Sequence, residues 1–206
     1  MDEYLNEQEQ WEVVRGWVRE NGPWLIAGVA LAAFGVWGWK AWQARQETRL
    51  LAASAQYEQL VAAFAKNDMP TVISLADKLA TEYPRTGYAE HGELTAARLE
   101  VENDQLPAAL ARLQKVLLAT KDHELALVVR LRIARLQIGL GKPDEAMASL
   151  AAVEPGAFAG RYAEVRGDAL WAKGDHPAAL KAYKEAQAAL GGAPGGDLLA
   201  LKIGSP

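Results

Sequence analysis

The sequence has no cysteine among its 206 residues. The chain therefore has no disulfide framework, no thiol nucleophile and no thiolate metal site, although this does not reveal its redox compartment. Basic residues are also too few to dominate its charge, because 22 lysines and arginines face 26 acidic residues and the formal net charge is -4. Nucleic-acid binding depends on neutralising phosphates with an excess of positive charge, so we expect no nucleic-acid partner.

Patterns that carry catalysis or bind metals are absent too. The three histidines, His91, His123 and His176, never fall three or four residues apart, the spacing at which two of them would share a helix face and a metal ion. Residues 191–196 are glycine-rich, but no lysine follows them as in a phosphate-binding loop, and they predict a linker. We expect no metal, no cofactor and no enzymatic activity.

One long apolar run stands near the N-terminus. Residues 21–39 carry no charge between Glu20 and Lys40. As a helix, these 19 residues rise by roughly 28 Å, which is close to the hydrocarbon thickness of a bilayer. The run therefore predicts a transmembrane anchor over residues 21–42. Tryptophans favour the headgroup boundary, and they mark both ends of the anchor: Trp24, Trp37, Trp39 and Trp42.

A cleavable signal peptide is the competing interpretation of this run. Its first segment should be basic, whereas residues 1–20 contain six acidic residues against Arg15 and Arg19. No pattern of small residues typical of a cleavage site follows the run, so we expect the anchor to stay attached behind an acidic N-terminal segment. Its direction stays open, because the positive charges on the two sides are nearly balanced: Arg15 and Arg19 before it, and Lys40, Arg45 and Arg49 after it.

Small residues form a stripe on the predicted anchor. Gly28, Ala32 and Gly35 recur at i, i+4 and i+7, so they share one helix face. Such a face lets a second transmembrane helix pack closely, and it is our candidate transmembrane packing face. The alternative is that these residues reflect only the general abundance of glycine and alanine in membrane helices.

Beyond residue 43 the pattern is helical throughout, with apolar positions at helical spacing and stops at glycine, proline, asparagine and aspartate. No strand-like alternation competes, so the fold class is all-α. The predicted helices span residues 43–66, 70–82, 87–103, 107–119, 123–140, 143–152, 159–173 and 177–190. Residues 191–206 then form a glycine-rich linker followed by a tail or a short capping helix.

These helices contain a repeat. Turns at Asp104, Gly141 and Gly174 recur at intervals of 37 and 33 residues. Five residues after each turn stands an alanine, and seven residues before it stands another small residue: Ala109, Ala146 and Ala179, and Ala97, Ala134 and Gly167. Small residues let the two helices of a hairpin cross closely. The layout resembles the tetratricopeptide repeat, so residues 43–190 predict a solenoid of helical hairpins.

Equivalent positions in the first helix of each hairpin should line the concave side of such a solenoid. One such position holds Arg98, Arg135 and Asp168, a second holds Val101, Ile138 and Trp171, and a third holds His91 and Arg161. We take five of these side chains as a candidate partner-binding groove for an extended peptide or a partner helix: Arg98, Arg135, Arg161, Asp168 and Trp171. Salt bridges and core packing within the solenoid would account for the same residues.

The order of acidic segment, anchor and divergent repeats resembles the ancillary SecYEG translocon subunit family, the YfgM-like proteins, over essentially the whole chain. The segments that carry this resemblance are Glu20–Gly22, Gly38–Trp42, Leu131–Arg135, Leu170–Asp175 and Leu198–Ile203. None of them is a catalytic motif, so the resemblance is one of architecture.

The resemblance implies a single-pass inner-membrane protein with residues 1–20 in the cytoplasm and the repeats in the periplasm. It also implies two partners, the SecYEG translocon and the periplasmic chaperone PpiD. The implied task is to assist newly translocated proteins, with unfolded or extended polypeptides as further ligands. The alternative within the same fold is a repeat scaffold for envelope assembly or cell division.

Overall fold

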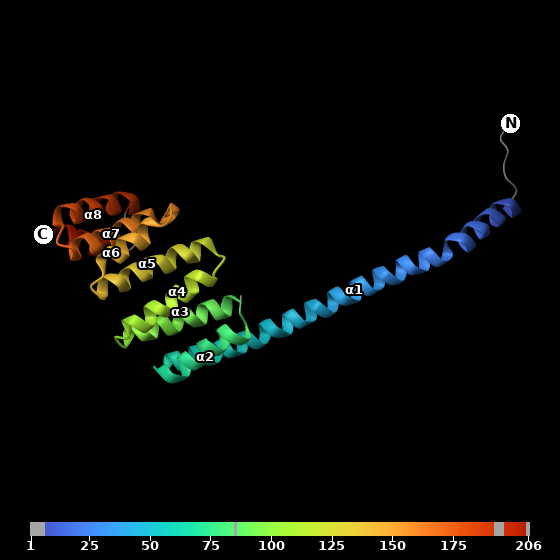
Figure 1. The fold of residues 1–206 in the computed structure, drawn as a ribbon, viewed down its shortest axis with the longest axis horizontal. Coiled ribbons are helices and arrows are strands. Elements are labelled where there is room, and N and C mark those ends of the chain that lie inside the picture. The colour runs from blue at the N-terminus through green and yellow to red at the C-terminus, as the bar shows by residue number, and fades with distance from the viewer. Residues whose placement is uncertain (1–6, 85, 192–195, 205–206) are drawn as a thin grey trace, which may run out of the picture. The chain divides into compact units, whose positions relative to one another are not determined.

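The computed structural model describes residues 7–84, 86–191 and 196–204, and every regular element in these ranges is helical. The first six residues of the predicted acidic segment, and residues 192–195 and 205–206 of the predicted tail, lie outside them. The elements are α1 (Glu7–Ala65), α2 (Met69–Glu82), α3 (Gly87–Glu102), α4 (Leu106–Ala119), α5 (His123–Gly139), α6 (Pro143–Ala151), the 3-10 turn η1 (Gly156–Phe158), α7 (Ala159–Ala172), α8 (His176–Leu190) and α9 (Gly196–Gly204) (Figure 1).

The predicted ranges of α2 to α8 are confirmed to within one residue at each end. Helix α1 differs. The sequence predicts an acidic segment, an anchor over residues 21–42 and a separate helix from residue 43, whereas the structure has one helix of 59 residues with Pro23 inside it. A proline inside a helix costs about 3 kcal/mol. Ending and restarting the helix would instead leave several backbone groups unpaired beside an apolar run, which costs more.

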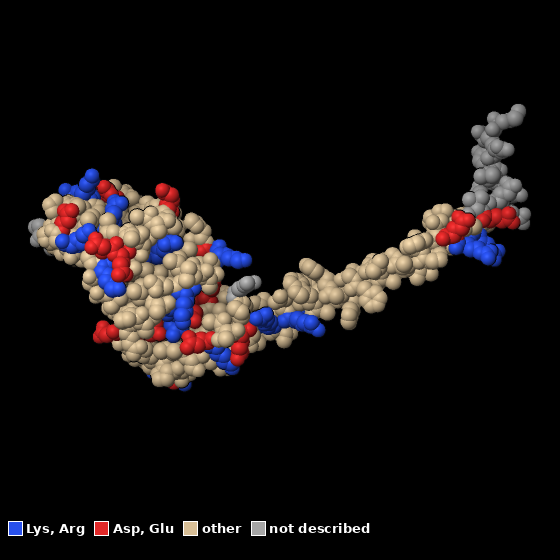
Figure 2. Space-filling view, in the orientation of Figure 1, with Lys and Arg blue, Asp and Glu red and all other residues tan. Residues whose placement is uncertain are grey.

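The chain divides into two compact units, residues 1–51 and 52–206. The first unit is the N-terminal part of α1. Its large apolar side chains are exposed in the part that the structure describes, and Figure 2 shows a stretch of this helix with no charged side chains. Within Val14–Ala65, an 18-residue window has a mean hydropathy of 1.4 and none of it is buried, so by length and composition this helix can cross a membrane.

The second unit is a row of helical hairpins (Figure 1). Within the described residues, four hairpins have a turn of the same construction between their two helices. One residue in each turn has a positive φ: Asn67 at 56°, Asp104 at 59°, Gly141 at 73° and Gly174 at 83°. The following backbone N–H donates to the carbonyl five residues earlier in every case, at 2.8 to 3.0 Å. This bond is typical of a right-handed helix that ends at a residue in the left-handed conformation. The turns predicted at Gly141 and Gly174 are confirmed, with both glycines left-handed, and Asp104 adopts the same conformation, which aspartate tolerates better than most residues.

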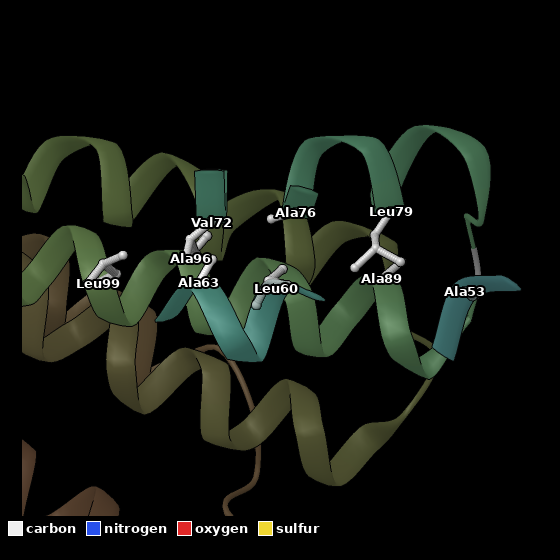
Figure 3. Packing of buried hydrophobic residues seen from close by; sticks show 9 residues of the cluster. All are labelled: Ala53, Leu60, Ala63, Val72, Ala76, Leu79, Ala89, Ala96 and Leu99. Atoms are coloured by element: carbon white, nitrogen blue, oxygen red, sulfur yellow. The ribbon is translucent and has the colours of Figure 1, made fainter. Parts of the chain in front are cut away.

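Asn67 shows that the end of α1 and helix α2 form one more hairpin of the series. It stands 37 residues before Asp104, the same interval that separates Asp104 from Gly141. Sequence comparison does not detect this hairpin, because large and small residues have exchanged places at two of its packing positions. The crossing position is Leu60 rather than a small residue, and Ala76 stands where the later hairpins have Leu113, Leu150 and Tyr183. Leu60, Val72, Ala76 and Leu79 are all fully buried in a cluster with α3 (Figure 3).

In the later hairpins the predicted small residues lie where the helices cross. Ala109, Ala146 and Ala179 are completely buried, as is Ala134. Gly167 makes the closest approach, because a Cβ atom at this position would collide with the aromatic ring of Tyr183 on α8. The small-residue pattern of the repeat therefore reflects close helix packing, as expected.

Arg112 of α4 ties three helices together. Its guanidinium contacts Asp77 of α2 at 2.9 Å, and Glu93 and Glu100 of α3 at 2.6 and 3.1 Å. Only 11% of the Arg112 side chain is exposed. Burial alone would lower the pKa of Arg112, but the hydrogen bonds to Glu100, Asp77 and Glu93 outweigh it and hold this pKa above its ordinary value. The guanidinium is therefore permanently charged within the packing between the first two hairpins.

Candidate functional site

A groove of about 680 Å³ opens between α3 and α5. Its floor is apolar, formed by the buried side chains of Ala97, Leu113 and Leu136, with Leu94 and Leu125 half-buried beside them. Ala97 is one of the small residues that the repeat pattern places at the helix crossing, and Leu113 packs in the same core cluster, so the packing that builds the hairpin also shapes the groove. Such a recessed apolar floor suits large aliphatic side chains of a ligand.

The border of the groove is basic. Arg98 comes from α3, and Arg132 and Arg135 come from successive turns of α5; all three are exposed. Arg98 donates to Glu102, the one acidic residue of the lining, at 2.8 Å, and its guanidinium lies 5.2 Å from the ring centre of Phe64. Arg132 and Arg135 form no ion pair with any side chain in the described ranges. Both guanidinium groups are exposed and can pair with a ligand, while the charge of Arg135 also acts on Glu164 of α7.

A second, smaller hollow of about 400 Å³ lies beside α9 and is lined by residues of α7, α8 and α9: Asp168, Trp171, Tyr183, Leu201 and Lys202. Lys202 contacts both carboxylate oxygens of Asp168, at 2.7 and 2.9 Å, and the Tyr183 hydroxyl donates to the same carboxylate at 2.9 Å. Burial, together with this hydrogen bond, raises the pKa of Tyr183 above its ordinary value. Asp168 is therefore already engaged by the chain's own C-terminal helix.

Glu164, one turn before Asp168, belongs to the same cluster. It accepts from Arg161 at 3.1 Å and from Lys202 at 3.2 Å. Burial alone would raise the pKa of Glu164, but the hydrogen bonds from Arg161 and Lys202 and the nearby charge of Arg135 lower it below its ordinary value. The carboxylate stays ionised in the folded chain and helps to hold α9, whose Leu199 is buried to 1% exposure.

The structure thus separates the residues that the sequence groups into one candidate groove. Arg98 and Arg135 lie together on the α3–α5 groove with His91, whereas Asp168 and Trp171 line the hollow at α9. Arg161 pairs with Glu164 on its own helix. The second repeat position, which holds Val101, Ile138 and Trp171, also differs between hairpins. Val101 lines the groove, while Ile138 packs into the core between α5 and α7.

Sequence reasoning misses two residues that matter here, Arg132 and Lys202. Arg132 precedes Arg135 by three residues, so helical spacing alone places both on one face of α5. Lys202 is the single charge in the apolar segment Leu198–Ile203, a pattern typical of a short helix that docks one face and pairs its charge. Its partners could not be found this way, since Asp168 and Glu164 are more than thirty residues distant.

The candidate transmembrane packing face lies in the first unit. Gly28, Ala32 and Gly35 are exposed on α1, and a Cβ atom added at Gly28 or Gly35 would meet nothing within 4 Å. The face is sterically open to a second helix, and its role stays a prediction. Across the residues that the structure describes, no group of three or more histidine or acidic side chains is placed to hold a metal ion.

Comparison with known proteins agrees with the helical-hairpin architecture. The family model described as a tetratricopeptide repeat-like domain matches residues 15–205. The chain is 35% identical over 184 residues to the ancillary SecYEG translocon subunit of Escherichia coli (strain K12), which covers 89% of this chain and 88% of that protein. It is 30% identical over 183 residues to the protein of the same name from Haemophilus influenzae, with 89% of each chain covered.

A more distant relative, the ancillary SecYEG translocon subunit of Neisseria gonorrhoeae, is 28% identical over 188 residues, or 90% of each chain. No solved structure matches the chain. The likeness to these relatives extends over nearly their whole length, and the residues matched by the family model, 15–205, include the apolar helix as well as the repeats. The chain therefore belongs to the family of ancillary SecYEG translocon subunits, built on a tetratricopeptide repeat-like domain.

Proposed function

We propose that this chain is a membrane-anchored protein-interaction module that associates with the SecYEG translocon and assists periplasmic chaperones with newly translocated proteins. The observation that carries the proposal is the likeness to ancillary SecYEG translocon subunits along 88% and 89% of two relatives' lengths. An exposed apolar helix that can cross a membrane supports a membrane location. A hairpin domain with an open groove supports binding rather than catalysis as its activity.

In this proposal α1 crosses the inner membrane once, with the N-terminus in the cytoplasm and the repeats in the periplasm. The proposed partners are the SecYEG translocon, met by the small-residue face of α1, and the chaperone PpiD, met by the repeat domain. Unfolded or extended polypeptides emerging from the translocon are the proposed ligands of the groove. Small residues favour close contact between membrane helices, and open basic and apolar side chains favour polypeptide ligands.

Site-specific photo-crosslinking in living cells tests the partners. A photoreactive amino acid is placed at Gly28, on the small-residue face, and at Arg135, in the groove, with Lys115 on α4 as a control position that is exposed but outside the groove lining. We expect Gly28 to give adducts with translocon subunits, and Arg135 to give adducts with PpiD or translocated polypeptides. Adducts with division or envelope-assembly proteins in place of these would contradict the proposal and favour the scaffold alternative.

Protease accessibility tests the direction of the anchor. When the outer membrane is permeabilised and the inner membrane is intact, added protease should digest residues 52–206 and spare the segment before the anchor. The same domain must be cleaved after detergent lysis, which shows that it is a substrate of the protease. Full protection in intact spheroplasts, combined with cleavage after lysis, would place the repeats in the cytoplasm and overturn the proposal.

A further inference from the structure

One position of the repeat carries a positive charge in two hairpins and a negative charge in the next. Asp168 of α7 corresponds in the repeat to Arg135 of α5 and Arg98 of α3. In the third of these hairpins the structure shows how the position is used, because Asp168 holds Lys202 of an incoming helix that buries Leu199 beside it. At Asp168, a charge next to an apolar surface therefore receives an oppositely charged side chain from a segment that docks there.

The α3–α5 groove has the same two components with the charge reversed. Its floor of Ala97, Leu113 and Leu136 is apolar, and its border carries Arg98, Arg132 and Arg135. The acidic residue of the lining, Glu102, is paired with Arg98. Neither Arg132 nor Arg135 forms an ion pair in the described part of the chain, although the charge of Arg135 also acts on Glu164, so both guanidinium groups can pair with a ligand. Opposite charge around an apolar centre determines which partner a surface accepts.

We propose that this groove binds acidic, leucine-rich segments of other polypeptides and rejects basic ones. The carboxylates of the segment pair with Arg132 and Arg135, while its aliphatic side chains contact the floor. This inference rests on the proposed function, since it names the class of polypeptide that the interaction module selects. A recessed apolar floor favours a polypeptide segment over the flat headgroup surface of an anionic membrane, which would meet the arginines but leave the floor uncovered.

The test uses the full chain in an uncharged detergent and three fluorescent twelve-residue peptides. In each peptide leucine alternates with a second residue, which is glutamate, glutamine or lysine. Binding is measured by fluorescence anisotropy for the wild type, Arg132→Glu, Arg135→Glu and the control Lys115→Glu. Lys115 is exposed on α4 and outside the groove lining, so the control makes the same charge change elsewhere on the domain.

We expect the wild type to bind the glutamate peptide most tightly and the lysine peptide least. Arg132→Glu and Arg135→Glu should each raise the Kd for the glutamate peptide about tenfold and lower the Kd for the lysine peptide, while Lys115→Glu should change neither. This reversal of preference cannot come from loss of folding, and circular dichroism confirms that each variant retains its helices. Equal binding of the three peptides, or an unchanged preference in the two arginine variants, would overturn the inference.

Two further measurements separate this inference from its alternatives. If the arginine variants lose binding to phosphatidylglycerol vesicles while keeping wild-type peptide preference, the groove is a lipid site and the inference fails. Co-purification of SecYEG is measured on the same proteins. Wild-type co-purification without peptide preference refutes the groove inference alone, whereas charge-selective peptide binding without any SecYEG association refutes the proposed function alone.

Discussion

Lys202 lies between the two carboxylate oxygens of Asp168, 2.7 and 2.9 Å from them, and so joins α9 to α7. The contact closes the end of the hairpin row, where an uncovered apolar surface would otherwise face water. It also pairs the charge of Asp168, whose equivalent position in the repeat carries arginine in the two preceding hairpins. The same repeat position therefore closes the C-terminal end of the domain at Asp168, whereas in the α3–α5 groove it carries Arg98, paired with Glu102 of its own helix, and Arg135, which forms no ion pair in the described residues.

Replacing Lys202 with alanine should release α9. The ammonium group contacts Glu164 as well as Asp168, and its side chain is 33% exposed, so solvent screens part of the attraction. We expect a local loss of about 1 kcal/mol, which speeds hydrogen exchange in residues 196–204 about fivefold. Lys184→Ala, at an exposed lysine of α8, is the control and should leave this exchange unchanged. Unchanged exchange in Lys202→Ala would show that Leu199 alone holds the helix.

Adding one methyl group at Gly167 should disturb the crossing of α7 and α8. The Tyr183 ring occupies the space that the new Cβ atom needs, so Gly167→Ala should lower the free energy of unfolding by about 1–3 kcal/mol. Gly139→Ala is the matched control, because its Cβ would meet Leu106 at an ordinary 3.5 Å and the helix should gain up to about 1 kcal/mol. Urea unfolding of residues 43–206 followed by circular dichroism measures both changes.

A double variant sharpens this prediction. The double variant combines Gly167→Ala with Tyr183→Leu. It therefore has the same alanine–leucine pair as the equivalent positions of the two preceding hairpins, Ala97 with Leu113 and Ala134 with Leu150. The double variant should therefore be more stable than the sum of the two single effects predicts. Additive losses would mean that the cost of Gly167→Ala does not come from the tyrosine ring.

Arg112→Met should be the most destabilising of these substitutions. It removes the cation that pairs with Asp77, Glu93 and Glu100, and the latter two carboxylates are nearly buried. Leaving such charges uncompensated costs about 3–5 kcal/mol, measured by urea unfolding of residues 43–206. Arg166→Met is the control, because Arg166 and its partner Glu185 are both about half exposed and such pairs contribute about 0–1 kcal/mol. Equal effects of the two substitutions would refute the role assigned to Arg112.

Acid should weaken the α7–α9 contact through Glu164. Its pKa is lower in the folded chain than the ordinary value of 4.5, so the stabilisation from its ionised form is complete above about pH 4.5 and is lost as the pH falls toward the folded pKa. Glu164→Gln should lack this contribution, about 1–2 kcal/mol, at neutral pH, and should show a flatter stability profile below pH 4.5. The control Glu145→Gln leaves the cluster intact and should keep the wild-type profile. Parallel profiles for wild type and Glu164→Gln would contradict the assignment.

The helices and turns of the second unit could be predicted from the sequence because their causes are local. Apolar spacing places each helix face, and glycine permits the left-handed residue at Gly141 and Gly174 whatever lies elsewhere in the fold. The apolar run of the anchor is visible for the same reason. Local signals were weaker for α1, where one proline suggests a helix start although a long continuous helix absorbs its cost.

The first hairpin and the use of each charged position required the tertiary structure. Packing preserves the combined volume of facing side chains rather than the size at each position. The first hairpin has large Leu60 where the others have a small residue, and small Ala76 where the others have a large one, so sequence alignment does not detect this repeat. Charge follows the same logic. Arg135 and Asp168 occupy equivalent positions in the sequence repeat, but only the fold brings Lys202 to Asp168 and places Arg135 at the groove with no ion pair in the described residues, because electrostatic pairing depends on distance in space.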